Sequence, residues 1–189
     1  MNKKIIIITA PSGAGKTSIT HYLLNKIPQL NFSISATTRR PRENEKNGVD
    51  YYFLTVEDFK NKINENTFVE WEMVYEGKYY GTLKQEIERI WNEEKIPLLD
   101  IDVKGALHVQ QQFPDNSLSV FIEPPSVDEL KKRLLSRGTE TAETLTTRIS
   151  KAEYEISFKH HFNKIIVNAD LQRACEEAEK AIKGFLEEK

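Results

Sequence analysis

The sequence contains a single cysteine and no long apolar segment, and these two absences exclude several classes of protein. Cys175 has no partner for a disulfide within the chain, so a small cross-linked secreted fold is excluded. The four consecutive isoleucines at positions 5–8 are too few for a signal sequence or a membrane span. We therefore expect a cytoplasmic protein that does not cross a membrane. Its 189 residues, 39% hydrophobic and 30% charged, are typical of one globular domain with its own core.

Carboxylates are absent from the first 42 residues, and Glu43 is the first acid of the chain. The bases of this segment are Lys3, Lys4, Lys16, Lys26, Arg39, Arg40 and Arg42. They give it a net charge of +7, and the other 147 residues must carry −9 because the whole chain carries −2. A segment without negative charge suits a small anionic ligand. We expect Lys3, Lys4 and Lys26 to be surface residues. The near-neutral chain gives no reason to expect nucleic-acid binding.

Hydrophobic patterning alternates between buried strands and helices along most of the chain. The expected strands lie at residues 5–10, 32–36, 51–54, 68–75, 78–81, 96–102, 118–122 and 164–168. The expected helices lie at residues 16–26, 55–64, 82–94, 103–112, 126–136, 142–158 and 171–186. The alternation predicts an α/β fold with a three-layer core around a parallel sheet. The strand-rich segment 33–83 interrupts the alternation and is expected to form an inserted subdomain.

Three of the expected helices begin with a capping pattern, in which an acid or amide follows a hydroxyl residue by three positions. The pairs are Thr55 with Asp58, Thr82 with Gln85, and Ser126 with Glu129. We expect each hydroxyl to accept a hydrogen bond from the first turn of the helix that follows it.

Residues 10–17 read Ala-Pro-Ser-Gly-Ala-Gly-Lys-Thr and match a phosphate-binding loop at every defined position except the first, where Ala10 replaces glycine. A strand enters this segment and a helix leaves it, as such a loop requires. Its backbone N–H groups and the start of the helix would bind phosphate oxygens. Lys16 can reach a transferred phosphoryl group, and the hydroxyl of Thr17 can ligate Mg²⁺.

Asp100 and Asp102 lie two positions apart at the end of a predicted strand, so both side chains point to the same face. The carboxyl edge of a parallel sheet is where ligands of such sheets bind. The two carboxylates could hold Mg²⁺ through water or bind a substrate. Capping of the following helix is the alternative role.

The chain resembles the guanylate kinases, which are ATP:GMP phosphotransferases, over essentially its whole length. The matching stretches are residues 10–17, FSISATTRRPR (32–42), GVDYYF (48–53), FVEW (68–71), YYGT (79–82), LDIDVKG (99–105), FIEPPS (121–126), 131–141 and IVN (166–168). Their order and spacing are specific, although each alone would be weak. The resemblance implies a core of residues 1–32, 84–126 and 155–189. It also implies a GMP-binding subdomain at 33–83 and a mobile lid at 127–154.

The resemblance assigns both ends of GMP to named side chains. The implied GMP-binding residues are Ser35, Arg39, Arg42, Tyr51, Glu70, Tyr80, Thr82 and Asp102. Two guanidinium groups and two phenols suit a phosphate dianion, because charge-assisted forks fix an oxyanion. The carboxylate of Glu70 can accept hydrogen bonds from N1–H and N2–H₂ of guanine. The alternatives are a solvent-facing Glu70 on an alternating strand, and core packing for Tyr51 and Tyr80.

The resemblance also assigns an ATP site, a metal and a lid. The implied ATP-binding residues are Ala10, Pro11, Ser12, Gly13, Ala14, Gly15, Lys16, Thr17 and Asn168. The implied catalytic residues are Lys16, Arg42, Arg133, Arg137 and Arg148, with Mg²⁺ as cofactor held by Thr17 and by Asp100, the latter directly or through water. A solvated charged surface is the alternative for the lid arginines, and a turn position is the alternative for Asn168.

Two other functions remain open at the level of the sequence. One is a nucleoside monophosphate kinase with another acceptor base, which Glu70 and the hydroxyls argue against. The other is a non-catalytic guanylate-kinase-like module that binds proteins, although such modules typically lack the loop lysine. The expected partners are ATP and GMP, with dGMP as a further acceptor that no residue excludes. Neither nucleic acid nor a membrane is expected. The sequence does not decide between a monomer and a homo-oligomer.

Overall fold

The computed structural model describes residues 3–136 and 142–188, so the predicted catalytic Arg137 lies outside the described residues. The large sheet is fully parallel, with the strand order β2-β7-β1-β8-β9. Its strands are β1 (Ile5–Thr9), β2 (Leu30–Phe32), β7 (Ile96–Asp100), β8 (Ser117–Glu123) and β9 (Lys164–Val167). The parallel α/β fold predicted from the alternating pattern is confirmed.

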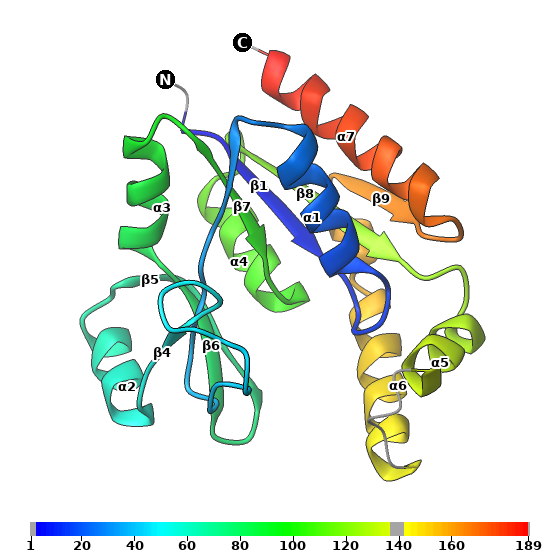
Figure 1. The fold of residues 1–189 in the computed structure, drawn as a ribbon, viewed down its shortest axis with the longest axis horizontal. Coiled ribbons are helices and arrows are strands. Elements are labelled where there is room, and N and C mark those ends of the chain that lie inside the picture. The colour runs from blue at the N-terminus through cyan, green and yellow to red at the C-terminus, as the bar shows by residue number, and fades with distance from the viewer. Residues whose placement is uncertain (1–2, 137–141, 189) are drawn as a thin grey trace.

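Helices cover both faces of this sheet (Figure 1). The helices α1 (Lys16–Lys26) and α7 (Leu171–Glu187) pack on one face, and α3 (Lys84–Asn92) and α4 (Val103–Gln112) pack on the other. Strand β1 explains the unbroken run of isoleucines, because Ile6 and Ile8 enter one core while Ile5 and Ile7 enter the other. All four are fully buried, as expected of a central strand covered on both sides.

A second, smaller sheet is built from residues 36–83 in the order β4-β3-β6-β5. Its strands are β3 (Ala36–Thr37), β4 (Tyr52–Phe53), β5 (Phe68–Tyr75) and β6 (Lys78–Leu83). Helix α2 (Val56–Asn64) covers it, and the ring of Phe59 stacks on that of Phe68 with centroids 4.4 Å apart. This small core is separate from the two cores of the large sheet.

Helices α5 (Val127–Ser136) and α6 (Ala142–Ile156) follow β8, and the short 3₁₀ turn Lys159–His161 leads from α6 to β9. The two helices share a core of their own, formed by Leu130, Leu134, Leu145 and Ala152. This pair and the second sheet project from the same end of the large sheet, on opposite sides of it (Figure 1). That end is the one at which the parallel strands terminate.

The strand expected at residues 32–36 is two strands in two different sheets. Strand β2 ends at Phe32 after pairing with β7, and β3 begins at Ala36 against β6 and β4. Between them the backbone N–H of Ser33 still donates to the carbonyl of Leu98, but that of Ile34 donates to the carboxylate of Glu86. The residue pattern could not show this change of partner, because both halves of the segment are extended.

Two of the three capping predictions are confirmed. Thr55 Oγ1 accepts from Asp58 N at 3.0 Å, and Ser126 Oγ accepts from Glu129 N at 3.1 Å. The prediction for Thr82 is wrong, because β6 continues through Leu83 and this residue is the N-cap of α3 without a side-chain bond. The hydroxyl of Thr82 is buried and turned toward β5.

Lys4 is not a surface residue, contrary to the expectation from its position in the chain. It is 8% exposed, and Nζ donates to the carbonyls of Phe185 at 2.7 Å and Glu188 at 2.6 Å. These carbonyls end α7, and a cation at a helix C-terminus is stabilising. Lys4, one of the seven bases in the first 42 residues, therefore holds the end of α7 against the start of β1.

Glu86 on α3 joins the large sheet to the second sheet. Its carboxylate accepts from the backbone N–H of Ile34 at 3.0 Å, from the hydroxyl of Tyr52 at 3.0 Å and from the guanidinium of Arg89 at 2.7 Å. The side chain of Glu86 is 2% exposed, so its carboxylate makes these hydrogen bonds in a place shielded from solvent. The contact with Ile34 lies in the segment where the chain passes between the sheets.

We expect Glu86→Gln to lower the free energy of unfolding by about 1–3 kcal/mol, because the amide NH₂ would face donors at one of the two oxygen positions. Urea unfolding measures this. The control is Glu88→Gln on the exposed side of the same helix, which should change stability by less than about 0.5 kcal/mol. Equal effects of the two substitutions would contradict the role given to Glu86.

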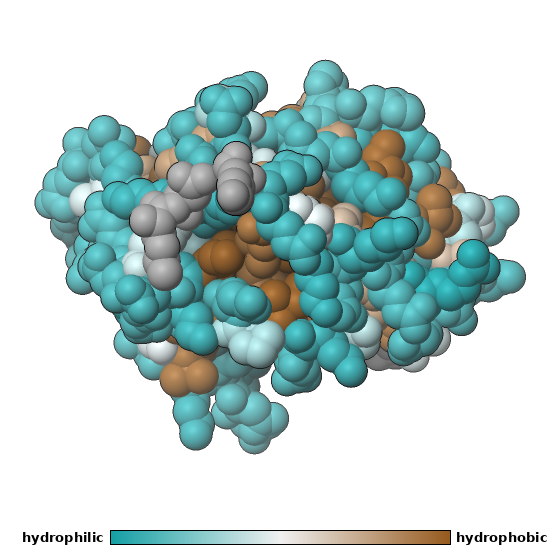
Figure 2. Space-filling view, turned by 90° about the horizontal axis from the view of Figure 1, so that it is seen from above, coloured by the Kyte–Doolittle hydropathy of each residue, from teal (hydrophilic) through white to brown (hydrophobic). Residues whose placement is uncertain are grey.

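The start of β1 and the last turn of α7 lie at the end of the molecule away from the second sheet (Figure 1). Seen from that end, the surface is largely hydrophilic around a hollow in which apolar residues are visible (Figure 2). None of the helices described is both long and apolar enough to cross a bilayer.

Candidate active site

The phosphate-binding loop runs from the end of β1 to Lys16, where α1 begins. Gly13 and Gly15 have φ of 92° and 98°, which is the left-handed region that favours glycine. Ala10 is buried and is not among the described residues with positive φ, so alanine fits there without backbone strain. The loop therefore keeps the glycines that its geometry requires, and the replacement of the first one is harmless.

Lys16 points from this loop to the carboxyl end of β7. Nζ lies 2.5 Å from Asp100 Oδ1 and donates to the carbonyl of Ile101 at 3.0 Å. Burial alone would lower the pKa of Lys16, but the charge of Asp100 and the hydrogen bond to it more than offset burial, so the pKa is raised. Lys16 is therefore a positive charge held in place at the carboxyl end of β7.

A cavity of about 180 Å³ opens beside Lys16. The predicted site residues that line it are Lys16, Ser35, Tyr51, Glu70, Tyr80, Asp100 and Asp102. They come from α1, from the second sheet and its neighbouring loops, and from the end of β7. The fold thus gathers side chains that are up to 86 positions apart in the sequence around one space.

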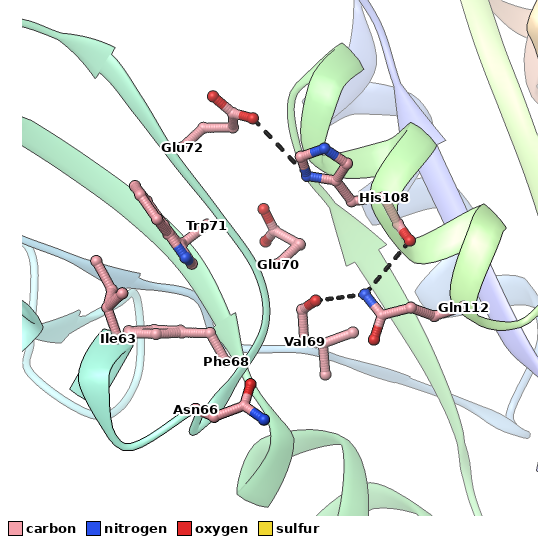
Figure 3. Close-up of a pocket in the computed structure, with 9 residues that line it drawn as sticks. All are labelled: Ile63, Asn66, Phe68, Val69, Glu70, Trp71, Glu72, His108 and Gln112. Carbon is pink, nitrogen blue, oxygen red and sulfur yellow. Dashed lines mark hydrogen bonds and ion pairs between the residues drawn. The ribbon is translucent and has the colours of Figure 1, made fainter.

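Glu70 on β5 is 6% exposed, which excludes the solvent-facing alternative. Its Oε1 accepts a hydrogen bond from Thr82 Oγ1 at 2.6 Å. Burial is the main cause that raises the pKa of Glu70 to about 8, the charges of Asp102 and Glu72 add to it, and the bond from Thr82 opposes it. The carboxylate lies between β5 and helix α4 (Figure 3).

Asp102 has the capping role that its position left open, and its role in binding Mg²⁺ or a substrate stays a prediction. It is the N-cap of α4, where Oδ1 accepts from Gly105 N at 2.8 Å, and it also lines the cavity. Asp100 is bound to Lys16, and the hydroxyl of Thr20 lies 3.5 Å from its other oxygen. The two carboxylates flank Ile101 at the sheet edge.

The arginines expected to bind phosphate share an acid that the pattern did not single out. Glu45 accepts two 2.6 Å bonds from the guanidinium of Arg39 and one of 2.7 Å from the backbone N–H of Arg42. The hydrogen bonds from Arg39 lower the pKa of Glu45 to about 2. The guanidinium also lies 4.8 Å from the centroid of the Tyr51 ring. Arg42 itself is exposed and does not line the cavity.

Helix α5, which belongs to the predicted lid, and Asn168 at the end of β9 contact the phosphate loop. Arg133 Nη2 donates to the carbonyl of Asn168 at 3.0 Å, and Asn168 Nδ2 donates to the carbonyl of Ala14 at 2.7 Å. The amide of Asn168 is thus bonded to the loop backbone. Arg148 on α6 is half-buried.

The two predicted oxygen donors for a cation lie on different elements. Thr17, in the first turn of α1, is exposed, and Asp100 lies at the end of β7. A hydroxyl and a carboxylate fit the hard-oxygen preference of Mg²⁺, which usually keeps several waters and few protein ligands.

The comparisons with known proteins agree with this geometry. The family model described as guanylate kinase matches residues 2–185. The chain belongs to the guanylate kinase family. The curated guanylate kinases of Porphyromonas gingivalis and Bacteroides fragilis are 50% and 48% identical to it over 97% of this chain, and the alignments cover 98% and 90% of the relatives.

A solved guanylate kinase from Anaplasma phagocytophilum superposes with a TM-score of 0.80 at 27% identity, covering 98% of this chain and 87% of that one. Membership of the guanylate kinase family makes the protein an enzyme of the phosphotransferase class.

Three residues of this guanylate kinase site did not stand out in the sequence. Glu45 holds Arg39, Glu86 holds the connection between the sheets, and Gly105 lies against Glu70. Glu45 follows Arg42 by three residues in a loop, which is the one local signal that could have pointed to it. The contacts that matter for the other two, of Glu86 with Ile34 and Tyr52 and of Gly105 with Glu70, join residues 34 positions or more apart along the chain.

Proposed function

We propose that the protein is a guanylate kinase that transfers the γ-phosphate of ATP to GMP, giving ADP and GDP. The observation that carries the proposal is that a phosphate-loop lysine and a buried carboxylate, Lys16 and Glu70, line the same cavity. The first suits the phosphoryl group that is transferred, and the second suits the base of the acceptor.

Guanine would be selected at the buried end of the cavity. Its N1–H and N2–H₂ are neighbouring donors that a carboxylate at Glu70 can accept, while hydroxyls such as that of Ser35 can reach O6. Adenine would place an acceptor at N1 against this carboxylate. A buried polar pair left unmatched in this way rejects a ligand by several kcal/mol.

The phosphate of GMP would bind nearer the mouth, among Arg39, Arg42, Tyr51 and Tyr80. Glu45 supports this role for Arg39, because two short bonds and the ring of Tyr51 fix the orientation of the guanidinium. A fixed fork loses little conformational entropy when it binds an oxyanion.

Phosphoryl transfer needs alignment, neutralised oxygens and exclusion of water rather than a covalent intermediate. The loop N–H groups and Lys16 would hold the β- and γ-phosphates of ATP. Thr17 and Asp100 would hold Mg²⁺, which supplies further neutralisation of phosphate charge when bound. Arg133 and Arg148, with Arg137 from outside the described residues, would approach the phosphates from α5 and α6. The acceptor phosphate needs no side-chain base, since it is largely ionised at neutral pH.

In the cell this reaction would recycle GMP and supply guanine nucleotides in the cytoplasm, with dGMP as a second acceptor. Glu70 and Thr82 would contact the base and not the sugar, so the proposal predicts no discrimination against the deoxy form by these two residues.

An acceptor panel tests the proposal. We expect ADP release from ATP with GMP and dGMP. With AMP, CMP, UMP and dTMP the rates should be lower by a factor of at least about 10². Coupled measurement of ADP gives kcat/KM for each acceptor. Preference for an acceptor other than a guanine nucleotide would overturn the assignment, and omission of Mg²⁺ should abolish the rate.

A further inference from the structure

Gly105, in the first turn of α4, lies against the carboxylate of Glu70. A Cβ atom built at Gly105 would stand 2.4 Å from Glu70 Oε2 and 3.0 Å from its Cδ. It would also lie 3.5 Å from Asp102 Oδ1, which is ordinary contact. Any side chain at position 105 therefore takes the place that one oxygen of Glu70 now occupies.

The backbone gives no reason for glycine at this position. Gly105 is not among the glycines with positive φ, which are Gly13, Gly15, Gly48 and Gly77. It lies inside a regular helix, with its N–H bonded to the N-cap Asp102. In such a place alanine is favoured over glycine by helix propensity. The missing side chain thus serves something other than the conformation of α4.

We propose that Gly105 is a positioning residue for guanine recognition, because its missing side chain lets the Glu70 carboxylate sit against the first turn of α4 while Thr82 holds its other oxygen. This inference rests on the proposed function, in which Glu70 binds the acceptor base. Thr82 donates to Oε1 on one side, and the first turn of α4 bounds Oε2 on the other. The positive end of the helix dipole favours a carboxylate at this place.

A methyl group at position 105 would move the carboxylate rather than break the fold. The clashing atoms belong to the end of a flexible side chain, and ordinary contact needs a retreat of about 1 Å. Gly81 differs, because its Cβ would meet the backbone oxygen of Glu70 at 2.8 Å and could not be accommodated so easily. Misplacement of a binding group by about 1 Å can cost up to about 10²-fold.

The test is Gly105→Ala. We expect KM for GMP to rise between about 10-fold and 10²-fold while KM for ATP changes less than about twofold. The preference for GMP over inosine monophosphate, which lacks the 2-amino group, should fall by a similar factor. Gly184→Ala is the matched control, because Gly184 is a helical glycine with nothing within 4 Å of its Cβ position. It should leave both constants unchanged.

A double-substitution cycle separates this inference from the proposed function. Glu70→Ala alone should raise KM for GMP, and adding Gly105→Ala to it should cause no further rise, because no carboxylate is left to displace. An unchanged GMP constant in Glu70→Ala would overturn the proposed role of Glu70. A large effect of Glu70→Ala with none from Gly105→Ala would overturn only the role of Gly105, as would equal effects of Gly105→Ala in both backgrounds.

Discussion

Lys16→Met is expected to lower kcat by about 10³-fold, since it removes the preorganised charge that the proposed function places next to the transferred phosphoryl group. The affinity for GMP should change little, because the predicted base contacts lie on β5 and β6 rather than on α1. Single-turnover formation of ADP measures the chemical step, and equilibrium titration with GMP measures the binding. Survival of more than about a tenth of the rate would contradict a catalytic role for Lys16.

The ion pair of Lys16 with Asp100 requires a control for folding. Methionine at position 16 leaves the half-buried carboxylate of Asp100 without its cation, and an unpaired carboxylate of this kind is destabilising. Adding Asp100→Asn should restore thermal stability without restoring the rate. Lys183→Met removes an exposed charge paired with Glu179. This substitution should change neither the thermal stability nor the rate. If the rate rose and fell with thermal stability across these variants, the loss of rate in Lys16→Met would be due to unfolding and not to the missing catalytic charge.

The local parts of this site could be predicted from the sequence, and the contacts between distant segments could not. The phosphate loop was predictable because its chemistry lies in eight consecutive residues and in the φ angles that Gly13 and Gly15 permit. The strand predicted at 5–10, which the structure has at Ile5–Thr9, was predictable because burial on both faces demands an unbroken apolar run such as its four isoleucines. The pairing of Lys16 with Asp100 joins segments 84 positions apart, so no local pattern contains it.

The two wrong predictions, for Thr82 and for Lys4, also arise from contacts between distant segments. Thr82 has the local pattern of a cap, but the register of β5 with β6 places it opposite Glu70, and the buried acceptor there determines its bond. Lys4 has the local pattern of a surface residue, but α7 ends beside it and offers free carbonyls. In both cases a tertiary partner outweighs the local preference, which for the cap at Thr82 is about 1 kcal/mol.

Glu70→Gln is expected to weaken GMP binding by about 2–4 kcal/mol, which corresponds to a factor of about 30 to 10³ in KM, while KM for ATP stays nearly constant. The amide would turn an NH₂ group toward guanine donors or toward Thr82, whose hydroxyl now donates to the carboxylate. The same substitution should stabilise the free protein near neutral pH, because the native carboxyl must take up a proton on folding to be neutral at a site that is 6% exposed, whereas an amide is already neutral. Loss of affinity together with a gain in thermal stability distinguishes lost recognition from damage to the fold.

The pH dependence of that stability has a defined sign. The pKa of Glu70 is raised to about 8 in the folded protein from an ordinary value of 4.5. Between these two values the folded state holds a proton that the unfolded state has released, so this group's contribution to stability declines as pH rises from 4.5 to 8. Below this window the contribution is fully present, and above it the decline stops. The advantage of Glu70→Gln over the native protein should therefore grow across the window and then level off.

Binding of GMP should show the opposite trend. The donors of guanine require the ionised carboxylate, which is the minor form of the free protein below pH 8, so the apparent affinity should rise with pH until about that value. The GMP phosphate also titrates, with a pKa near 6, but it does so equally with both proteins. Titrations of the native protein and of Glu70→Gln from about pH 6.5 to 9 separate the two groups. Parallel profiles would show that Glu70 enters the complex already ionised and that burial does not control its proton.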